Sequence, residues 1–172
     1  MYDFDLHYSM KKKIVQTILE SGDKQNKKTN VQAYMTDWNI QSSEITCFSR
    51  WLENKIYWNL DLMPKFAGKN NSLTAKLQQV DCWGAVYNRG DYTETHNHNL
   101  NYLSFVYFVN TPKGSSPLVF TTSNKKIKAE EGKVIIFNSS INHHVPKNKC
   151  DDRIIIAGNY TVDQKELINR PL

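Results

Sequence analysis

Cysteine is scarce in this sequence, and long apolar segments are absent. The three cysteines, Cys47, Cys82 and Cys150, are too few and too far apart for a disulfide framework or a zinc cluster, so we expect free thiols. The longest apolar runs, such as Val134–Phe137, are far shorter than the ~20 residues of a membrane span. The N-terminus, Met1–Asp5, is acidic where a secretory signal would be basic, and no apolar stretch follows it. These absences predict a cytoplasmic protein without membrane contact.

The composition also excludes disordered and fibrous chains. Hydrophobic residues make up 40% and charged residues 23% of the 172 positions, as in a globular protein of one domain. The formal net charge is +5, from 22 basic and 17 acidic residues. That charge permits contact with nucleic acid, but no strand combines aromatic and basic residues in the pattern that binds bases. Nucleic acid is therefore not the favoured partner.

The pattern changes from helical to extended along the chain. Helical spacing of apolar residues predicts a helix over 9–21, with Ser9 as N-cap and Gly22 at its end, and a second helix from Ser42 to about residue 60. From residue 78, short apolar stretches alternate with turn residues, which predicts antiparallel strands. We expect strands at 78–87, 103–109, 118–121, 133–137, 142–145 and 153–160. The chain is then one mainly β (α+β) domain, 1–172, with a helical buttress at 1–77, a β core at 78–160 and a tail at 161–172.

Four of the five histidines lie between residues 96 and 144. His96 and His98 stand two apart, and on an extended strand such residues point to the same face, so both can reach one metal ion. A third ligand would be His143 or His144, but not both, because neighbours on a strand face opposite sides. Three protein ligands leave positions open for other ligands, as in a catalytic site. His7 lies outside this group and receives no role.

Several loose motifs accompany the histidines in a fixed order over residues 83–160. The motifs are Tyr87-x-x-Gly90, His96-Asn97-His98, Tyr107-Phe108-Val109-Asn110, Gly132-Lys133-Val134-Ile135-Ile136-Phe137, His143-His144-Val145 and Arg153. Taken together they resemble the iron- and 2-oxoglutarate-dependent dioxygenases, particularly the members similar to prolyl 4-hydroxylases. The likeness is strongest to a small bacterial and phage group with a Trp before Tyr-x-x-Gly-Asp and with His-x-His, as here at Trp83 and His96.

This resemblance implies a fold and a metal. The fold would be a double-stranded β-helix (a jelly roll, cupin-like) with the N-terminal helices packed on one sheet. Fe(II) would be held by His96 and His143, with His98 in the slot where most relatives have a carboxylate. Alternatives for that slot are a carboxylate from Glu94 or Asp91, or a water molecule. Because imidazole binds metal in its neutral form, an ordinary histidine pKa predicts that metal affinity falls as the pH drops through about 6.5.

The resemblance also implies a cosubstrate site. Arg153 would pair with the 5-carboxylate of 2-oxoglutarate, for which a guanidinium fork is well suited. Tyr87 and Tyr107 would donate hydroxyl groups to the same carboxylate, and Ser104 would lie on the strand that lines the cofactor pocket. Many relatives carry a hydroxyl residue two positions after the arginine, where this chain has Ile155.

The implied activity is hydroxylation of a C–H bond, favouring a peptidyl proline, with O2 and 2-oxoglutarate consumed and succinate and CO2 released. A peptide or protein substrate and ascorbate as a reductant belong to this expectation. If the gene belongs to a phage, the protein would act in the host cytoplasm. Two alternatives stay open: a cupin-like three-histidine dioxygenase without 2-oxoglutarate, and a non-enzymatic jelly-roll binding or structural phage protein. The sequence makes no prediction of oligomeric state.

Overall fold

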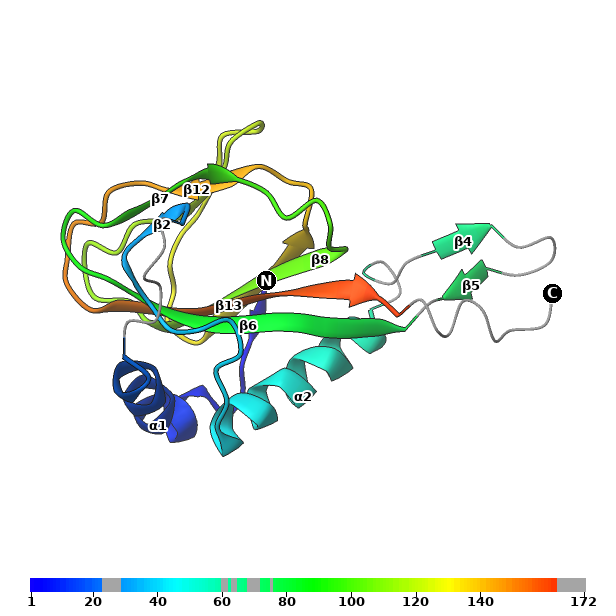
Figure 1. Ribbon diagram of the computed structural model, residues 1–172, viewed down its shortest axis with the longest axis horizontal. Helices are drawn as coiled ribbons and strands as arrows, with labels where there is room; N and C mark the ends of the chain where they lie inside the picture. The colour runs from blue at the N-terminus through cyan, green and yellow to red at the C-terminus, as the bar shows by residue number, and fades with distance from the viewer. Residues whose placement is uncertain (23–28, 60–61, 63–64, 68–71, 75, 164–172) are drawn as a thin grey trace.

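The computed structural model describes residues 1–22, 29–59, 62, 65–67, 72–74 and 76–163. Two antiparallel sheets face each other, and two helices cover the outer face of the larger sheet (Figure 1). This arrangement confirms the expected jelly roll with helices on one sheet. The larger sheet has the order β1 (Tyr2–Asp3), β11 (Lys133–Asn138), β8 (Leu103–Asn110), β13 (Arg153–Val162), β6 (Leu77–Tyr87) and β3 (Tyr34–Met35).

The smaller sheet lies across the cavity from the larger one. Its order is β10 (Lys125–Ile127), β9 (Leu118–Phe120), β12 (His143–Val145), β7 (Tyr92–His96) and β2 (Val31–Gln32). A separate hairpin of β4 (Lys65–Ala67) and β5 (Ser72–Thr74) stands away from the two sheets (Figure 1). All six predicted strands are present, with ends shifted by up to two residues.

Strand alternation divides the core into two layers. On β13, Ile154 and Ile156 face the helices, whereas Ile155 and Ala157 face the space between the sheets. Because both faces of the larger sheet are covered, its central strands can be apolar along their whole length instead of alternating with polar residues. Arg153, at the start of β13, has the parity of Ile155 and therefore faces the space between the sheets.

The two helices are α1 (His7–Glu20) and α2 (Ser43–Tyr57). The Ser42 side chain accepts a hydrogen bond from the Ile45 N–H at 3.2 Å and caps α2, so this helix opens where the sequence predicted. The predicted N-cap of α1 is wrong: the helix begins at His7, and the Ser9 hydroxyl donates back to the Leu6 carbonyl. Gly84 on β6 allows α1 to pack closely, because a Cβ there would lie 2.6 Å from the Ile18 side chain.

Residues 1–77 are not only helical. Besides α1 and α2, they supply β1 and β3 to the edges of the larger sheet and β2 to an edge of the smaller one. Each of these strands has two residues, too few for the alternation of a strand to show in the sequence. Of the predicted C-terminal tail, residues 161–162 extend β13, and residues 164–172 lie outside the described part of the chain.

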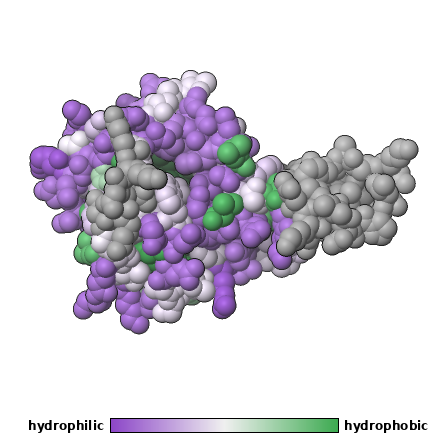
Figure 2. Space-filling view, in the orientation of Figure 1, coloured by the Kyte–Doolittle hydropathy of each residue, from purple (hydrophilic) through white to green (hydrophobic). Residues whose placement is uncertain are grey.

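The face of the molecule seen in Figure 2 is mostly polar. Figure 2 shows hydrophilic residues over most of the two-sheet body, with a few separate apolar side chains among them. Neither described helix combines the length and apolarity needed to cross a membrane. The three cysteines are free thiols, as expected.

Candidate metal centre and adjoining cavity

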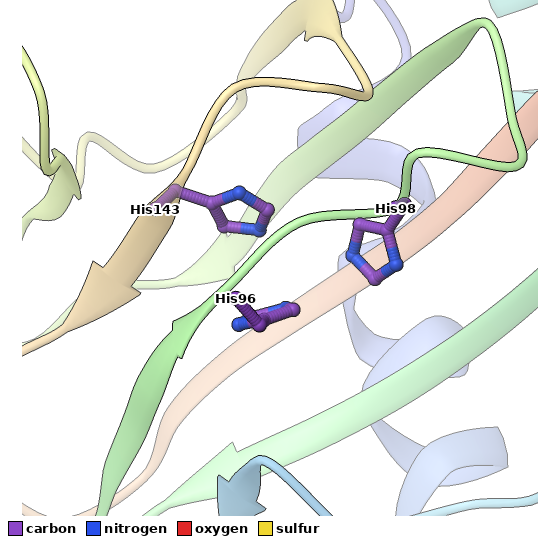
Figure 3. Close-up of side chains that lie close together, drawn as sticks. All are labelled: His96, His98 and His143. Carbon is purple, nitrogen blue, oxygen red and sulfur yellow. The ribbon is translucent and has the colours of Figure 1, made fainter.

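His96, His98 and His143 converge at one mouth of the space between the sheets (Figure 3). One ring nitrogen from each lies within 4.8 Å of the others, a spacing at which all three can bind a single ion. His96 is the last residue of β7, and its antiparallel partner in the register of β12 is His143. The tertiary structure therefore brings together the three histidines that the sequence motifs indicated.

His98 reaches the cluster from a loop. Strand β7 ends at His96, so His98 is not on the strand and strand alternation does not explain its direction. The predicted outcome, that both rings lie together, is nevertheless correct. The backbone N–H of His98 donates to the Ser139 carbonyl at 2.8 Å, and the His98 carbonyl accepts from the Asn101 N–H at 2.8 Å. These two hydrogen bonds fix the loop that turns the His98 ring toward the other two.

Backbone carbonyls orient two of the rings. His96 Nδ1 donates to the Glu94 carbonyl at 2.8 Å, and His143 Nδ1 donates to the Ile141 carbonyl at 2.9 Å. In each case the acceptor lies two residues before the histidine. A proton held on Nδ1 leaves Nε2 as the nitrogen with a free lone pair. The carbonyl acceptors thereby orient each ring with Nε2 available to bind a metal.

The histidines are held in their neutral form. Burial is the main cause that lowers the pKa of His98 and of His143 to about 4, and repulsion from neighbouring histidines adds to it. Burial also lowers the pKa of His96. Since neutral imidazole is the form that binds metal, the cluster is ready to bind at neutral pH.

The cluster contains histidines alone among the residues that the structure describes. The Glu94 side chain is exposed, and the Asp91 carboxylate accepts from the Asn88 N–H at 2.7 Å, so neither supplies the carboxylate considered from the sequence. His144 lies outside the cluster, with Nδ1 3.1 Å from the Thr121 hydroxyl. Of the two adjacent histidines, His143 is therefore the one that faces the metal centre.

Arg153 lines the same cavity as the three histidines. Its side chain is 1% exposed, which rules out an ordinary surface ion pair with Asp151 or Asp152. The Nε group donates to the Ser116 carbonyl at 3.1 Å, while the buried Nη1 finds no hydrogen-bond partner within the described structure. A buried charge normally has a partner, so this guanidinium is prepared for an anion.

Tyr87 stands beside the arginine. It is the register partner of Arg153 across β6 and β13, and the guanidinium lies over its ring, 4.7 Å from the centroid. The Tyr87 hydroxyl is 2.8 Å from the Thr93 hydroxyl. Burial raises the pKa of Tyr87, which keeps the phenol protonated and able to donate a hydrogen bond. Tyr87 and Arg153 thus form a buried polar pair that lines the same cavity as the histidines.

The cavity between the histidines and this pair is narrow. Its free volume is about 40 Å³, room for a few water molecules, and Leu118 and Ile155 are among the apolar side chains that line it. Trp83 also lines it, with its ring centroid 6.2 Å from that of His98. A larger ligand would require some of these side chains to move.

Tyr107 does not belong to this site, so the prediction that it contacts the cosubstrate is wrong. It packs in the layer between the larger sheet and the helices, and its hydroxyl is 2.6 Å from Nδ1 of His7. The reason is strand parity: Ser104 and Tyr107 are three residues apart on β8, so they face opposite sides. His7, which received no role from the sequence, is a buried residue that links α1 to the sheet.

Ser104 lines the cavity as expected and is part of a hydrogen-bonded chain. Its hydroxyl donates to Asn159 Oδ1 at 2.7 Å and lies 2.9 Å from the Ser139 hydroxyl. The Asn159 amide donates to both carboxylate oxygens of Asp81, at 2.9 and 3.0 Å. Through Ser139, whose carbonyl accepts from the His98 N–H, this chain reaches the metal centre.

No protein-family model matches the chain, and a search of curated proteins finds no match. Solved structures do match. A viral collagen prolyl hydroxylase from Paramecium bursaria Chlorella virus 1, solved with 2-oxoglutarate, is 14% identical with a TM-score of 0.66, over 90% of this chain and 91% of that one. A prolyl 4-hydroxylase from Pseudomonas putida is 15% identical with a TM-score of 0.66, over 92% and 87%.

A third match is a prolyl hydroxylase from Trichoplax adhaerens, in complex with a peptide fragment of the hypoxia inducible factor oxygen degradation domain. It is 16% identical with a TM-score of 0.63, over 95% of this chain and 83% of that one. At these identities the likeness shows the fold. The chain therefore shares the jelly-roll fold of these hydroxylases along nearly its whole length.

Proposed function

We propose that this protein is an Fe(II)- and 2-oxoglutarate-dependent dioxygenase that hydroxylates a C–H bond. The observation that carries the proposal is the buried Nη1 of Arg153, which has no hydrogen-bond partner in the described part of the chain and lies in the same cavity as an open three-histidine cluster. One end of the cavity offers ligands for a metal, and the other offers a cation for a carboxylate. A keto acid with a second carboxylate can use both ends at once.

The residues present fit these two groups. His96, His98 and His143 would hold Fe(II), which accepts imidazole ligands readily. Arg153 would bind the 5-carboxylate of 2-oxoglutarate through Nη1, and the Tyr87 phenol would donate to the same group. Bound iron would supply the redox chemistry by which O2 and 2-oxoglutarate yield succinate, CO2 and a hydroxylated product, with ascorbate as a reductant.

The protein's own part is orientation and exclusion of water. Carbonyl acceptors on Nδ1 hold the rings of His96 and His143, and the packed cavity keeps bulk solvent from the guanidinium. In this desolvated setting the charge-assisted hydrogen bonds from Arg153 are stronger than they would be in water. Its planar fork fixes the direction from which the diacid enters the metal centre.

The proposed substrate is a peptidyl proline in a peptide or protein. Two structural neighbours are prolyl hydroxylases acting on collagen or bound to a peptide, which supports this class. At the metal centre, Trp83 packs edge-on against Trp38, whose side chain is 42% exposed, with ring centroids 4.9 Å apart. An aromatic surface suits the apolar ring of proline. A nucleic-acid base is less favoured, and the proposed location is the cytoplasm, or that of a host if a phage encodes the protein.

A second candidate is a cupin-like dioxygenase that uses three histidines without 2-oxoglutarate. The all-histidine cluster favours it, whereas the buried Nη1 of Arg153, which has no hydrogen-bond partner among the described residues, favours the first proposal. A non-enzymatic jelly-roll protein has no need of either feature.

The test is an anaerobic titration of the protein with Fe(II) and then with 2-oxoglutarate, followed by the visible charge-transfer absorption of the chelate. We expect the band to form with the parent and not with Arg153→Leu. Succinate release after admission of O2, with proline-rich peptides added, then measures turnover. Iron binding without a 2-oxoglutarate band would reject the first proposal in favour of the three-histidine dioxygenase.

A further inference from the structure

Asn148 is a buried asparagine in the loop between β12 and β13. It is 2% exposed, although the surrounding run Pro146–Cys150 has the composition of a surface turn. Both its neighbours, Lys147 and Lys149, are exposed. Burial of an amide is unfavourable unless every polar atom is satisfied, so its environment must supply specific partners.

Those partners satisfy the whole side chain. Asn148 Oδ1 accepts from the Ser116 N–H at 2.9 Å, and Nδ2 donates to the carbonyls of Tyr87 at 3.1 Å and Cys150 at 2.7 Å. Because an N–H can only donate and a carbonyl can only accept, the three partners fix the orientation of the amide. The backbone of Asn148 is also bonded, to Asp91 and Gly90.

Each side-chain partner of Asn148 belongs to a segment that contacts or contains Tyr87 or Arg153. Tyr87 is itself one member of the pair and ends β6. Ser116 provides the carbonyl that accepts from Arg153 Nε. Cys150 lies on the short connection that leads into Arg153 at the start of β13. One amide therefore ties together three segments that meet around the guanidinium.

We propose that Asn148 is a positioning residue for the cosubstrate, which holds Arg153 and Tyr87 in the relative placement that binds a carboxylate. This inference rests on the proposed 2-oxoglutarate site. Asn148 does not line the cavity and is not one of the metal-binding histidines, so it acts through its partners. Its loss should weaken diacid binding and leave metal binding intact.

Asn159 offers a matched control. It is also an asparagine of 2% exposure with a fully bonded side chain, but its partners are Ser104 and Asp81, and Ser104 contacts Ser139, which holds the His98 loop. The two variants Asn148→Ala and Asn159→Ala therefore remove similar buried amides from different ends of the site. A general loss of packing would weaken both metal and 2-oxoglutarate binding in each variant. If Asn148 positions Arg153 and Tyr87, its loss should weaken 2-oxoglutarate binding specifically.

The experiment measures two affinities for the parent and both variants by anaerobic calorimetry: Zn(II) for the apo-protein, and 2-oxoglutarate for the Zn(II)-loaded protein. We expect Asn148→Ala to bind 2-oxoglutarate about 10- to 100-fold more weakly, as for loss of a residue that orients a ligand-binding group, and to bind Zn(II) within about twofold of the parent. We expect Asn159→Ala to lose less 2-oxoglutarate affinity than Asn148→Ala does. Asn148→Ser, which keeps a small acceptor for the Ser116 N–H, should give an intermediate value and serves if the alanine variant does not fold.

The possible failures are distinct. If the parent binds no 2-oxoglutarate, the proposed function and this inference both fall. If the parent binds it and Asn148→Ala and Asn148→Ser bind it equally well, the inference alone falls. It also falls if Asn148→Ala loses Zn(II) and 2-oxoglutarate affinity to the same extent, because that result indicates a merely structural residue.

Discussion

His96 and His143 are partners in the register of two antiparallel strands, and their ring centroids lie 4.3 Å apart. The two residues are far apart in the chain, yet each donates its Nδ1 proton to the carbonyl two residues before it. Strand pairing thus places two imidazoles beside each other at the mouth of the cavity, with their planes at 53°. The third ring, His98, completes the cluster from a loop held by Ser139.

The first prediction separates the adjacent histidines. His143→Ala should abolish tight binding of a divalent ion, because it removes one of three ligands. His144→Ala should leave binding close to that of the parent, since this side chain contacts Thr121 outside the cluster. Titration of each apo-protein with Co(II), followed by its visible spectrum, measures both. The opposite order of effects would contradict the placement of the two rings.

The second prediction concerns the pH dependence of metal binding. The pKa values of His98 and His143 are lowered to about 4, and that of His96 is lowered as well, so protons compete with the metal below the ordinary histidine range. Zn(II) affinity should therefore change little between pH 8 and 6 and fall as the pH approaches 4. This corrects the expectation of a fall through about 6.5, which assumed histidines with an unperturbed pKa. Calorimetric titrations at several pH values, with proton release measured from buffers of different ionisation enthalpy, test it.

The third prediction applies the same shifts to stability. Between pH 6.5 and about 4 the unfolded chain holds these histidines protonated, whereas the folded chain holds them neutral. The unfolded state then binds more protons, so the free energy of unfolding of the apo-protein falls as the pH drops through this window. Urea unfolding at pH 7 and pH 5 measures the fall. In His98→Asn the difference should be smaller, and an unchanged difference would contradict the assignment.

The fourth prediction gives Arg153 opposite effects on stability and binding. In the apo-protein its Nη1 is buried without a hydrogen-bond partner in the described structure, so Arg153→Leu should raise the free energy of unfolding, by up to about 1–4 kcal/mol. The same change should weaken 2-oxoglutarate binding by about 2–5 kcal/mol, the usual effect of truncating one member of a buried charge pair. Arg153→Lys should recover part of the binding. Thermal unfolding and calorimetry provide the two readouts, and a less stable variant that still binds would reject this role.

The fifth prediction compares two buried tyrosines. Tyr87→Phe should weaken 2-oxoglutarate binding, since the lost phenol faces the cavity beside Arg153. Tyr107→Phe should leave that binding unchanged and lower the free energy of unfolding by about 1 kcal/mol, because it loses a buried hydrogen bond to His7. Both 2-oxoglutarate binding and urea unfolding are measured for each variant, so that each serves as the control for the other. Reduced 2-oxoglutarate affinity in Tyr107→Phe would instead support the sequence-based prediction that Tyr107 contacts the cosubstrate.

The sequence by itself determined six of the strands and the candidates for the metal centre. Apolar runs between turn residues located these strands, because a strand buried on both faces needs an unbroken apolar sequence. The spacing of His96 and His98 indicated a shared metal ion with His143 or His144 as the third ligand, and the resemblance to a known family pointed to His143 and Arg153. These features depend on short motifs and local periodicity, which are written directly in the order of residues.

The tertiary structure alone decided what depends on contacts between distant segments. It placed His98 through a hydrogen bond to Ser139 and chose His143 over His144 through strand register. It also left the buried Nη1 of Arg153 without a hydrogen-bond partner among the residues that the structure describes. It also buried Asn148 in a loop whose composition predicts exposure. No local pattern can reveal such features, because whether a polar group is satisfied depends on which remote carbonyl or amide the fold brings within hydrogen-bonding distance.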